Sequence, residues 1–166
     1  MEVFLNKLYY SFFLFAVKLH FLFNKVCPFF LLFRIPYFKK KFKRKKYNPI
    51  EEFNRMWNNK ETGFNLRIAD FYLMAVIFLP LLSVTLLLFK IALESDIAAT
   101  LDYKIFIAVG ALSFFICYHY IYKGDKYLLY FKKYEKWDSK KSTKWMIISF
   151  LLVALSIIIF FQSMLF

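Results

Sequence analysis

Three stretches of this chain carry no Asp, Glu, Lys or Arg over about the length that a bilayer requires. They cover residues 71–89, 105–122 and 145–166. A helix that crosses the hydrocarbon core of a bilayer needs about 20 consecutive, mostly apolar residues. Leu, Ile, Val and Phe dominate the three stretches, and each of these residues favours insertion. The sequence therefore predicts an all-α integral membrane protein with three transmembrane helices.

The composition of the whole chain argues against burying these helices in a soluble core. Of the 166 residues, 61% are hydrophobic, with 24 Phe and only 3 Gly. Ordinary soluble domains contain about 45–50% apolar residues. The remaining polar chain is too short to cover three such helices in water. We expect the lipid bilayer to cover the excess apolar surface.

Positive charge is distributed unequally between the three stretches. Residues 39–70 carry ten Lys or Arg against four acidic residues, and residues 123–144 carry eight against three. Residues 90–104 carry only two against three. Because Lys and Arg of short loops remain on the cytoplasmic side, residues 39–70 and 123–144 are predicted to be cytoplasmic. Residues 90–104 and the C-terminus are predicted to lie on the outer side of the cytoplasmic (inner) membrane.

The densest positive charge is the run KKKFKRKK at residues 39–46. Its basic residues are Lys39, Lys40, Lys41, Lys43, Arg44, Lys45 and Lys46. Such a run determines topology and gains about 1 kcal/mol per residue near an anionic leaflet. Nucleic-acid phosphates attract the same charges, but no recognition motif accompanies the run. We expect contact with anionic headgroups, and a membrane-tethered nucleic-acid binder is the alternative.

The hydrophobic N-terminal region, residues 1–38, allows two interpretations. Four polar residues fall on one narrow helical face, namely Lys7, Ser11, Lys18 and Lys25. A polar stripe on an aromatic-rich helix is typical of a helix that lies in the membrane interface. Two prolines, Pro28 and Pro36, interrupt the region. We expect two short interfacial helices, and the alternative is a fourth span over roughly residues 8–33.

Each cytoplasmic segment contains one short amphipathic helix pattern. Asn48 and Pro49 are typical of a helix N-terminus, and Gly63 is typical of a residue that ends a helical segment. Residues 125–137 place five aromatic side chains on one face, namely Tyr127, Tyr130, Phe131, Tyr134 and Trp137. Tyr and Trp prefer the headgroup layer. We therefore expect this face to contact headgroups, with single-stranded nucleic acid as the alternative.

Small residues within the spans predict where helices pack. Ser149, Ser156 and Ser163 repeat every seven residues in the third span, and the second span offers Gly110, Ser113 and Cys117. Small residues let membrane helices approach closely. We expect these two rows of small residues to face each other or a partner protein. Pro80, in the middle of the first span, is predicted to kink its helix.

The chain shows no sign of catalytic chemistry. Charged residues inside spans usually mark ion or substrate pathways, and the three stretches contain none. Motifs for phosphate binding, hydrolysis and metal ligation are missing, so no enzyme activity, cofactor or metal is predicted.

A few apolar spans joined by basic loops, without a catalytic set, resemble bacterial immunity proteins against membrane-active toxins. This resemblance concerns architecture only, and no residue is carried over from it. It implies a non-enzymatic protein that acts through helix–helix or lipid contacts with a protein partner or with itself, as an immunity protein or an accessory subunit of a membrane complex. A small oligomeric channel or transporter component is the alternative.

Overall fold

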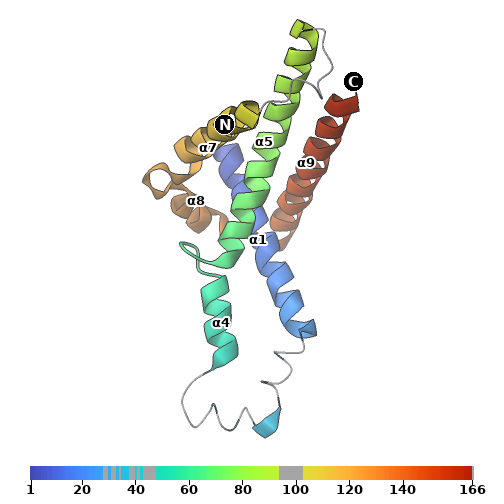
Figure 1. Ribbon diagram of the computed structural model, residues 1–166. Helices are drawn as coiled ribbons and strands as arrows, with labels where there is room; N and C mark the ends of the chain where they lie inside the picture. The colour runs from blue at the N-terminus through green and yellow to red at the C-terminus, as the bar shows by residue number, and fades with distance from the viewer. Residues whose placement is uncertain are drawn as a thin grey trace.

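The computed structural model describes residues 1–27, 30, 33, 35–37, 40, 42, 48–93 and 103–165. Every secondary-structure element in these residues is a helix (Figure 1). The prediction of an all-α chain is therefore confirmed for the part of the chain that the structure describes.

Within these residues, three helical stretches are long and apolar enough to cross a membrane. The first is α5 (Phe64–Leu93) and the third is α9 (Ser139–Leu165). The second comprises α7 (Tyr103–Cys117), the π-helix Tyr118–Tyr122, the 3-10 turn Lys123–Asp125 and α8 (Lys126–Tyr134). The three predicted spans lie within these stretches, apart from Phe166, which lies outside the described residues together with residues 94–102 of the predicted outer loop.

The second stretch changes direction after the π-helix. Gly124 and Asp125 have positive φ angles of 69° and 52°, and Asp125 leads directly into α8. A glycine in the left-handed backbone conformation commonly ends a helix. Figure 1 shows α8 turned away from α7 at this point. The predicted boundary at Tyr122 is thus the end of the continuous apolar helix.

The N-terminal helix α1 (Glu2–Val26) lies across one end of the long helices. It packs on α5, α8, α9 and the π-helix. Its ring contacts reach Tyr72 near the start of α5 and both Trp145 and Phe150 near the start of α9. In Figure 1, α1 crosses the lower parts of α5 and α9. Residues 28–38, where a second short helix was predicted, lie largely outside the described residues.

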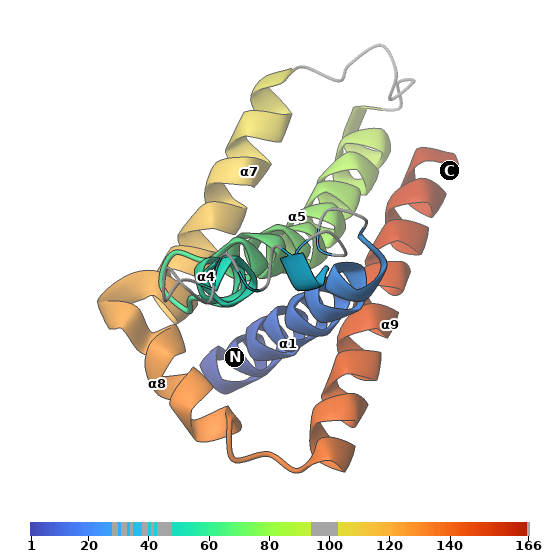
Figure 2. The same cartoon turned by 90° about the horizontal axis from the view of Figure 1, so that it is seen from below.

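The three long helices form an open layer rather than a closed bundle. Helix α5 lies between α7 and α9 and contacts both (Figure 2). We call α1 and the part of the molecule that it packs on the near half, and the remainder of the long helices the far half. The near half comprises α1 together with residues 64–77, 116–134 and 139–153, and the far half comprises residues 78–93, 103–115 and 154–165.

Helix α4 (Pro49–Trp57) begins as the sequence predicts. Pro49 is its first residue, and the side-chain oxygen of Asn48 accepts a hydrogen bond from the Glu51 amide at 3.4 Å. Gly63 lies between α4 and α5 in a tight turn. A Cβ atom at this position would lie 2.3 Å from the carbonyl oxygen of Asn59, so only glycine fits there.

Candidate functional site

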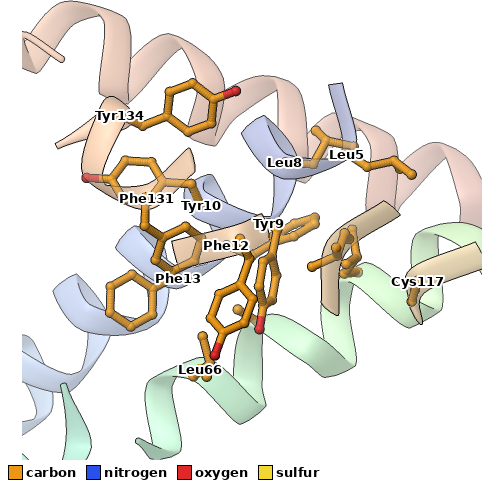
Figure 3. Packing of buried hydrophobic residues seen from close by; sticks show 14 residues of the cluster. Leu5, Leu8, Tyr9, Tyr10, Phe12, Phe13, Leu66, Cys117, Phe131 and Tyr134 are labelled. Atoms are coloured by element: carbon orange, nitrogen blue, oxygen red, sulfur yellow. The ribbon is translucent and has the colours of Figure 1, made fainter. Parts of the chain in front are cut away.

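The larger of the two clusters of buried hydrophobic residues in the described part of the chain includes aromatic rings of α1 and α8 (Figure 3). Phe131 of α8 is fully buried at its centre. Its ring centroid lies 5.3 Å from that of Tyr9, 5.0 Å from that of Tyr10 and 5.2 Å from that of Phe13. Aromatic pairs at such distances contribute about 0.5–1.5 kcal/mol each beyond the burial of their area. The cluster therefore attaches α8 firmly to α1.

This packing corrects the prediction for three of the five aromatic residues on the face of residues 125–137, while Tyr130 and Trp137 are half-buried. Tyr127, Phe131 and Tyr134 are buried against protein, whereas headgroup contact was expected. The physical reason is that α1 presents a complementary row of apolar and aromatic side chains. An aromatic helix face has the same sequence pattern whether it meets lipid or another helix, so the pattern alone does not identify its neighbour.

A carboxylate at the start of α5 joins three elements. Oδ1 of Asp70 accepts hydrogen bonds from the hydroxyls of Tyr9 and Tyr122, both at 2.6 Å. The Arg67 guanidinium lies 3.6 Å from Oδ2 of the same side chain. Burial, reinforced by the charge of Asp70, raises the pKa of Tyr9 well above its usual range. The Tyr9 hydroxyl therefore stays protonated and remains a donor. Asp70, Tyr9 and Tyr122 together link α5, α1 and the π-helix, and we call this group a polar joint.

The π-helix supplies a second polar contact for α1. The Nδ2 atom of Asn6 donates to the backbone carbonyl of Tyr120 at 3.0 Å and to that of Glu2 at 2.9 Å. A π-helical turn leaves carbonyl groups out of the regular α-helical pattern, and such turns are frequent at functional sites. Asn6 is buried and supplies a donor to one of these carbonyls.

A group of side chains around one histidine, His20, joins α1 to α4. The Nε2 atom of His20 lies 2.9 Å from Oδ1 of Asn54 and 3.0 Å from Nδ2 of Asn24. Asn24 also donates to Asn54 at 2.7 Å. The imidazole stacks on Trp57, with ring centroids 4.8 Å apart and planes inclined by 14°. Because His20 is buried between these partners, it positions α4 against α1.

The predicted rows of small residues are buried, but they do not face each other. Ser149, Ser156 and Ser163 are buried on α9, which packs along α5. Ser113 and Cys117 are buried on α7, which packs on the other side of α5. The expectation that the two rows meet is wrong, because α5 lies between them. Five of these six small residues are buried within the chain and Gly110 is half-buried, while contact of either row with a partner protein stays a prediction.

Individual contacts show how these small residues are used. A Cβ atom at Gly110 would meet the Phe78 ring at 4.0 Å, and Sγ of Cys117 lies 3.4 Å from Sδ of Met74. Each serine hydroxyl donates to a carbonyl of its own helix, as Ser156 does to Leu152 at 2.8 Å. The serines therefore act through their small size, which lets a neighbouring helix approach, since their hydroxyls bond within their own helix.

Pro80 lies inside α5, which continues without interruption from Phe64 to Leu93. The hydroxyls of Ser83 and Thr85 donate to the carbonyls of Leu79 and Leu81, both at 2.8 Å. Both carbonyls lie beside the proline, whereas the carbonyl that Pro80 leaves without its regular helical donor is that of Val76, and the helix still runs through this position without a break. The helix therefore accommodates Pro80 within one continuous element.

Of the seven basic residues in the run at 39–46, the structure describes one. Lys40 is exposed. The other residues lie outside the described part of the chain, namely Lys39, Lys41, Lys43, Arg44, Lys45 and Lys46. The contact of this run with anionic headgroups therefore stays a prediction.

Sequence reasoning missed the polar joints because Asp70 comes directly before the first uncharged stretch and was grouped with the cytoplasmic loop. The residues of the predicted polar stripe on α1 have different surroundings from one another. Ser11 is buried, Lys7 lies over the Trp145 ring at 4.9 Å, and Lys18 is exposed. The useful signal was the uncharged polar residues of α1, which must find partners once they are buried.

Nowhere in the described ranges do three or more His, Cys, Asp or Glu side chains gather in a way that could hold a metal ion. No protein-family model matches the chain, and no curated protein or solved structure matches it either. The molecule's own surfaces and contacts are therefore the basis for inferring its function.

Proposed function

We propose that this chain is a multi-pass protein of the cytoplasmic membrane that acts through helix and lipid contacts. The observation that carries the proposal is the outward orientation of large apolar side chains on the long helices. Phe71 on α5, Ile107 on α7 and Leu151 on α9 are each more than 60% exposed. Soluble proteins rarely leave contiguous apolar surface of this extent in water. Hydrocarbon is the solvent that suits it.

Helix α1 is best placed at the cytoplasmic boundary of the bilayer. It contacts the start of α5, the end of the α7 stretch and the start of α9. In the topology indicated by the loop charges, these three ends all lie on the cytoplasmic side. The proposed arrangement is therefore three spans covered on one side by an interfacial helix, which is favoured over a fourth span.

The open layer indicates how such a protein would engage a membrane partner. Helix α7 packs on α5 through Val109, Ser113 and Cys117, whereas the opposite face exposes large apolar residues. A second protein could place a helix on that face without disturbing the internal contacts. This geometry suits an immunity protein that occupies a toxin or its target, or an accessory subunit of a membrane complex.

Labelling of the two ends of α9 tests the insertion and its orientation. We would introduce Leu165→Cys or Ser139→Cys into a background of Cys27→Ser and Cys117→Ala. An impermeant maleimide should label position 165 in spheroplasts and position 139 only after permeabilisation. Carbonate should leave the chain in the membrane pellet. Release by carbonate, or labelling of position 139 in intact spheroplasts, would overturn the proposal.

Crosslinking tests the partner face. Ile107→Cys and Ser113→Cys, in the same cysteine-free background, form a matched pair on α7, since the first side chain is exposed and the second is buried. In native membranes, Ile107→Cys should give an adduct with a distinct protein or a second copy, and Ser113→Cys should not. Adducts of equal yield at both positions, or at neither, would count against this surface as the contact.

A further inference from the structure

An apolar groove of about 440 Å³ runs between α1 and α9. Its volume lies within the range of small-molecule sites, roughly 300–1,000 Å³. Its apolar walls come from both helices and include Phe15, Leu19, Leu22, Ile147, Phe150 and Leu151. Figure 2 shows α1 and α9 next to each other, and the two helices are in contact. The groove is open, so a molecule in the surrounding solvent can enter it from the side.

A second hollow, of about 510 Å³, continues from this groove along α9. It shares Thr143 and Ile147 with the apolar groove, but its other walls include Ser139, Lys140 and Lys144. One surface thus changes from hydrocarbon to cationic and hydroxyl groups within two helical turns. An amphipathic ligand with a negative head and an apolar tail matches this order.

The lysines around this surface are not used by acidic partners in the described part of the chain. Lys18 lines the apolar groove, while Lys140 and Lys144 line the second hollow, and none of the three forms an ion pair there. Other lysines of the molecule are engaged within the chain. Lys7 lies over Trp145, and Lys126 lies 2.8 Å from Glu2.

Asp138 is the acidic residue closest in sequence to this surface. Its Oδ1 already accepts a hydrogen bond from the Lys141 amide at the start of α9. Its carboxylate therefore caps the helix. The charge of Lys18, Lys140 and Lys144 remains available to an anion.

We propose that this surface binds one anionic phospholipid of the cytoplasmic leaflet. The acyl chain occupies the groove between α1 and α9, and the phosphate lies near Lys18, Lys140 and Lys144. The proposal rests on the proposed membrane insertion, because the groove then opens to the acyl layer and the lysines lie at headgroup depth. Long lysine stems can follow the apolar wall while their amines reach the headgroup.

Native mass spectrometry in mild detergent tests the site, with phosphatidylglycerol and phosphatidylcholine of identical chains as probes. Wild-type protein should retain phosphatidylglycerol in preference to phosphatidylcholine. Lys18→Ala combined with Lys144→Ala should weaken phosphatidylglycerol binding about 30-fold, which corresponds to about 2 kcal/mol for two lysines at an anionic surface. The matched control is Lys132→Ala with Lys133→Ala, two exposed residues of α8 outside the groove, and its binding should stay within about twofold of wild type.

The apolar part of the site needs its own variant. Ile147→Trp narrows the groove and leaves all three lysines in place, so it should weaken phosphatidylglycerol binding while the melting temperature stays near that of wild type. Equal retention of the two lipids by wild type would overturn the proposal. Equal losses in the groove and control lysine variants would also overturn it, because they would indicate attraction by overall charge.

Carbonate extraction of the wild type separates this proposal from the proposed function. Protein that stays in the membrane pellet without a preference for phosphatidylglycerol refutes only the lipid site. Protein that carbonate releases refutes the membrane insertion on which both depend.

Discussion

The near and far halves of the molecule are held together in different ways. In the near half, fourteen buried residues form one cluster in which tyrosines and phenylalanines of α1 meet α5, the π-helix and α8. In the far half, the corresponding cluster contains Leu82, Leu86 and Val109. The near half therefore has a core like that of a soluble domain, whereas the far half has little interior of its own.

This difference indicates where the protein depends on its surroundings. Buried rings and hydrogen-bonded hydroxyls stabilise the near half through contacts within the chain. The far half exposes side chains such as Phe161 and Ile107. Membrane helices associate without a hydrophobic driving force between them, since lipid is as apolar as leucine. We expect mutations in the near half to affect stability strongly and mutations on the outer surface of the far half to affect it weakly.

The largest expected effect is that of Phe131→Ala in the aromatic cluster. Removal of a fully buried phenylalanine ring costs about 3–5 kcal/mol through lost burial and the remaining cavity. The matched control is Phe161→Ala on the far half of α9, where the ring is 61% exposed. This change should stay within about 0.5 kcal/mol. Reversible unfolding in detergent measures both, and equal losses would remove the distinction between the halves.

The next effect is that of Asp70→Ala, which tests the polar joint of the near half. The change leaves the hydroxyls of Tyr9 and Tyr122 without their acceptor. An unsatisfied buried donor costs about 1–3 kcal/mol, so we expect a loss of about 3 kcal/mol in the free energy of unfolding. Tyr9→Phe combined with Asp70→Ala should cost less than the sum of the two single changes. Strict additivity would show that these side chains do not act as one unit.

The long helices of the far half could largely be predicted from the sequence, because the length of each apolar stretch without charged residues determines them. Long apolar stretches without charge predict long helices. The predicted stretches lie in α5, in α7 with the π-helix that follows it and, apart from Phe166, in α9. The start of α4 was equally predictable. Asn48 and Pro49 act through local backbone geometry, which depends only on neighbouring residues.

The near half could not be predicted in the same way, because its contacts join residues far apart in the chain. Tyr9 meets Asp70, and Asn6 meets Tyr120. The aromatic residues of α1 and α8 would have the same spacing on a lipid surface, so their pairing leaves no periodic signal. Ser149 and Ser156 are buried on α9, but their spacing did not reveal that α9 packs on α5 and α1 and not on α7.

A smaller effect is expected from His20→Ala, which tests whether α4 belongs to the near half. His20 stacks on Trp57 and bonds to Asn54. One stacked pair and one hydrogen bond together are worth about 2 kcal/mol, so amides of α4 should exchange roughly 30 times faster. His20→Phe, which keeps a ring for stacking, should give an intermediate rate. Unchanged exchange in α4 would show that other contacts hold this helix.

The smallest effect is expected at the exposed edge of the near half, where Glu2 bonds to Lys126 at 2.8 Å and Tyr130 at 3.1 Å. The bond to Lys126 lowers the pKa of Glu2 below its ordinary value of 4.5. A carboxyl whose pKa is lower in the folded state adds stability above the unfolded pKa and loses it as the pH falls through the folded value. Glu2→Gln should therefore lower the melting temperature slightly at pH 7, and its difference from wild type should shrink as the pH falls below 4.5. Glu61→Gln, at an exposed position in the turn after α4, is the control and should show no such convergence. A difference between wild type and Glu2→Gln that persists unchanged as the pH falls would mean that the Glu2 charge does not help to hold α8 against α1, and the attachment of α8 would then rest mainly on its ring contacts with α1.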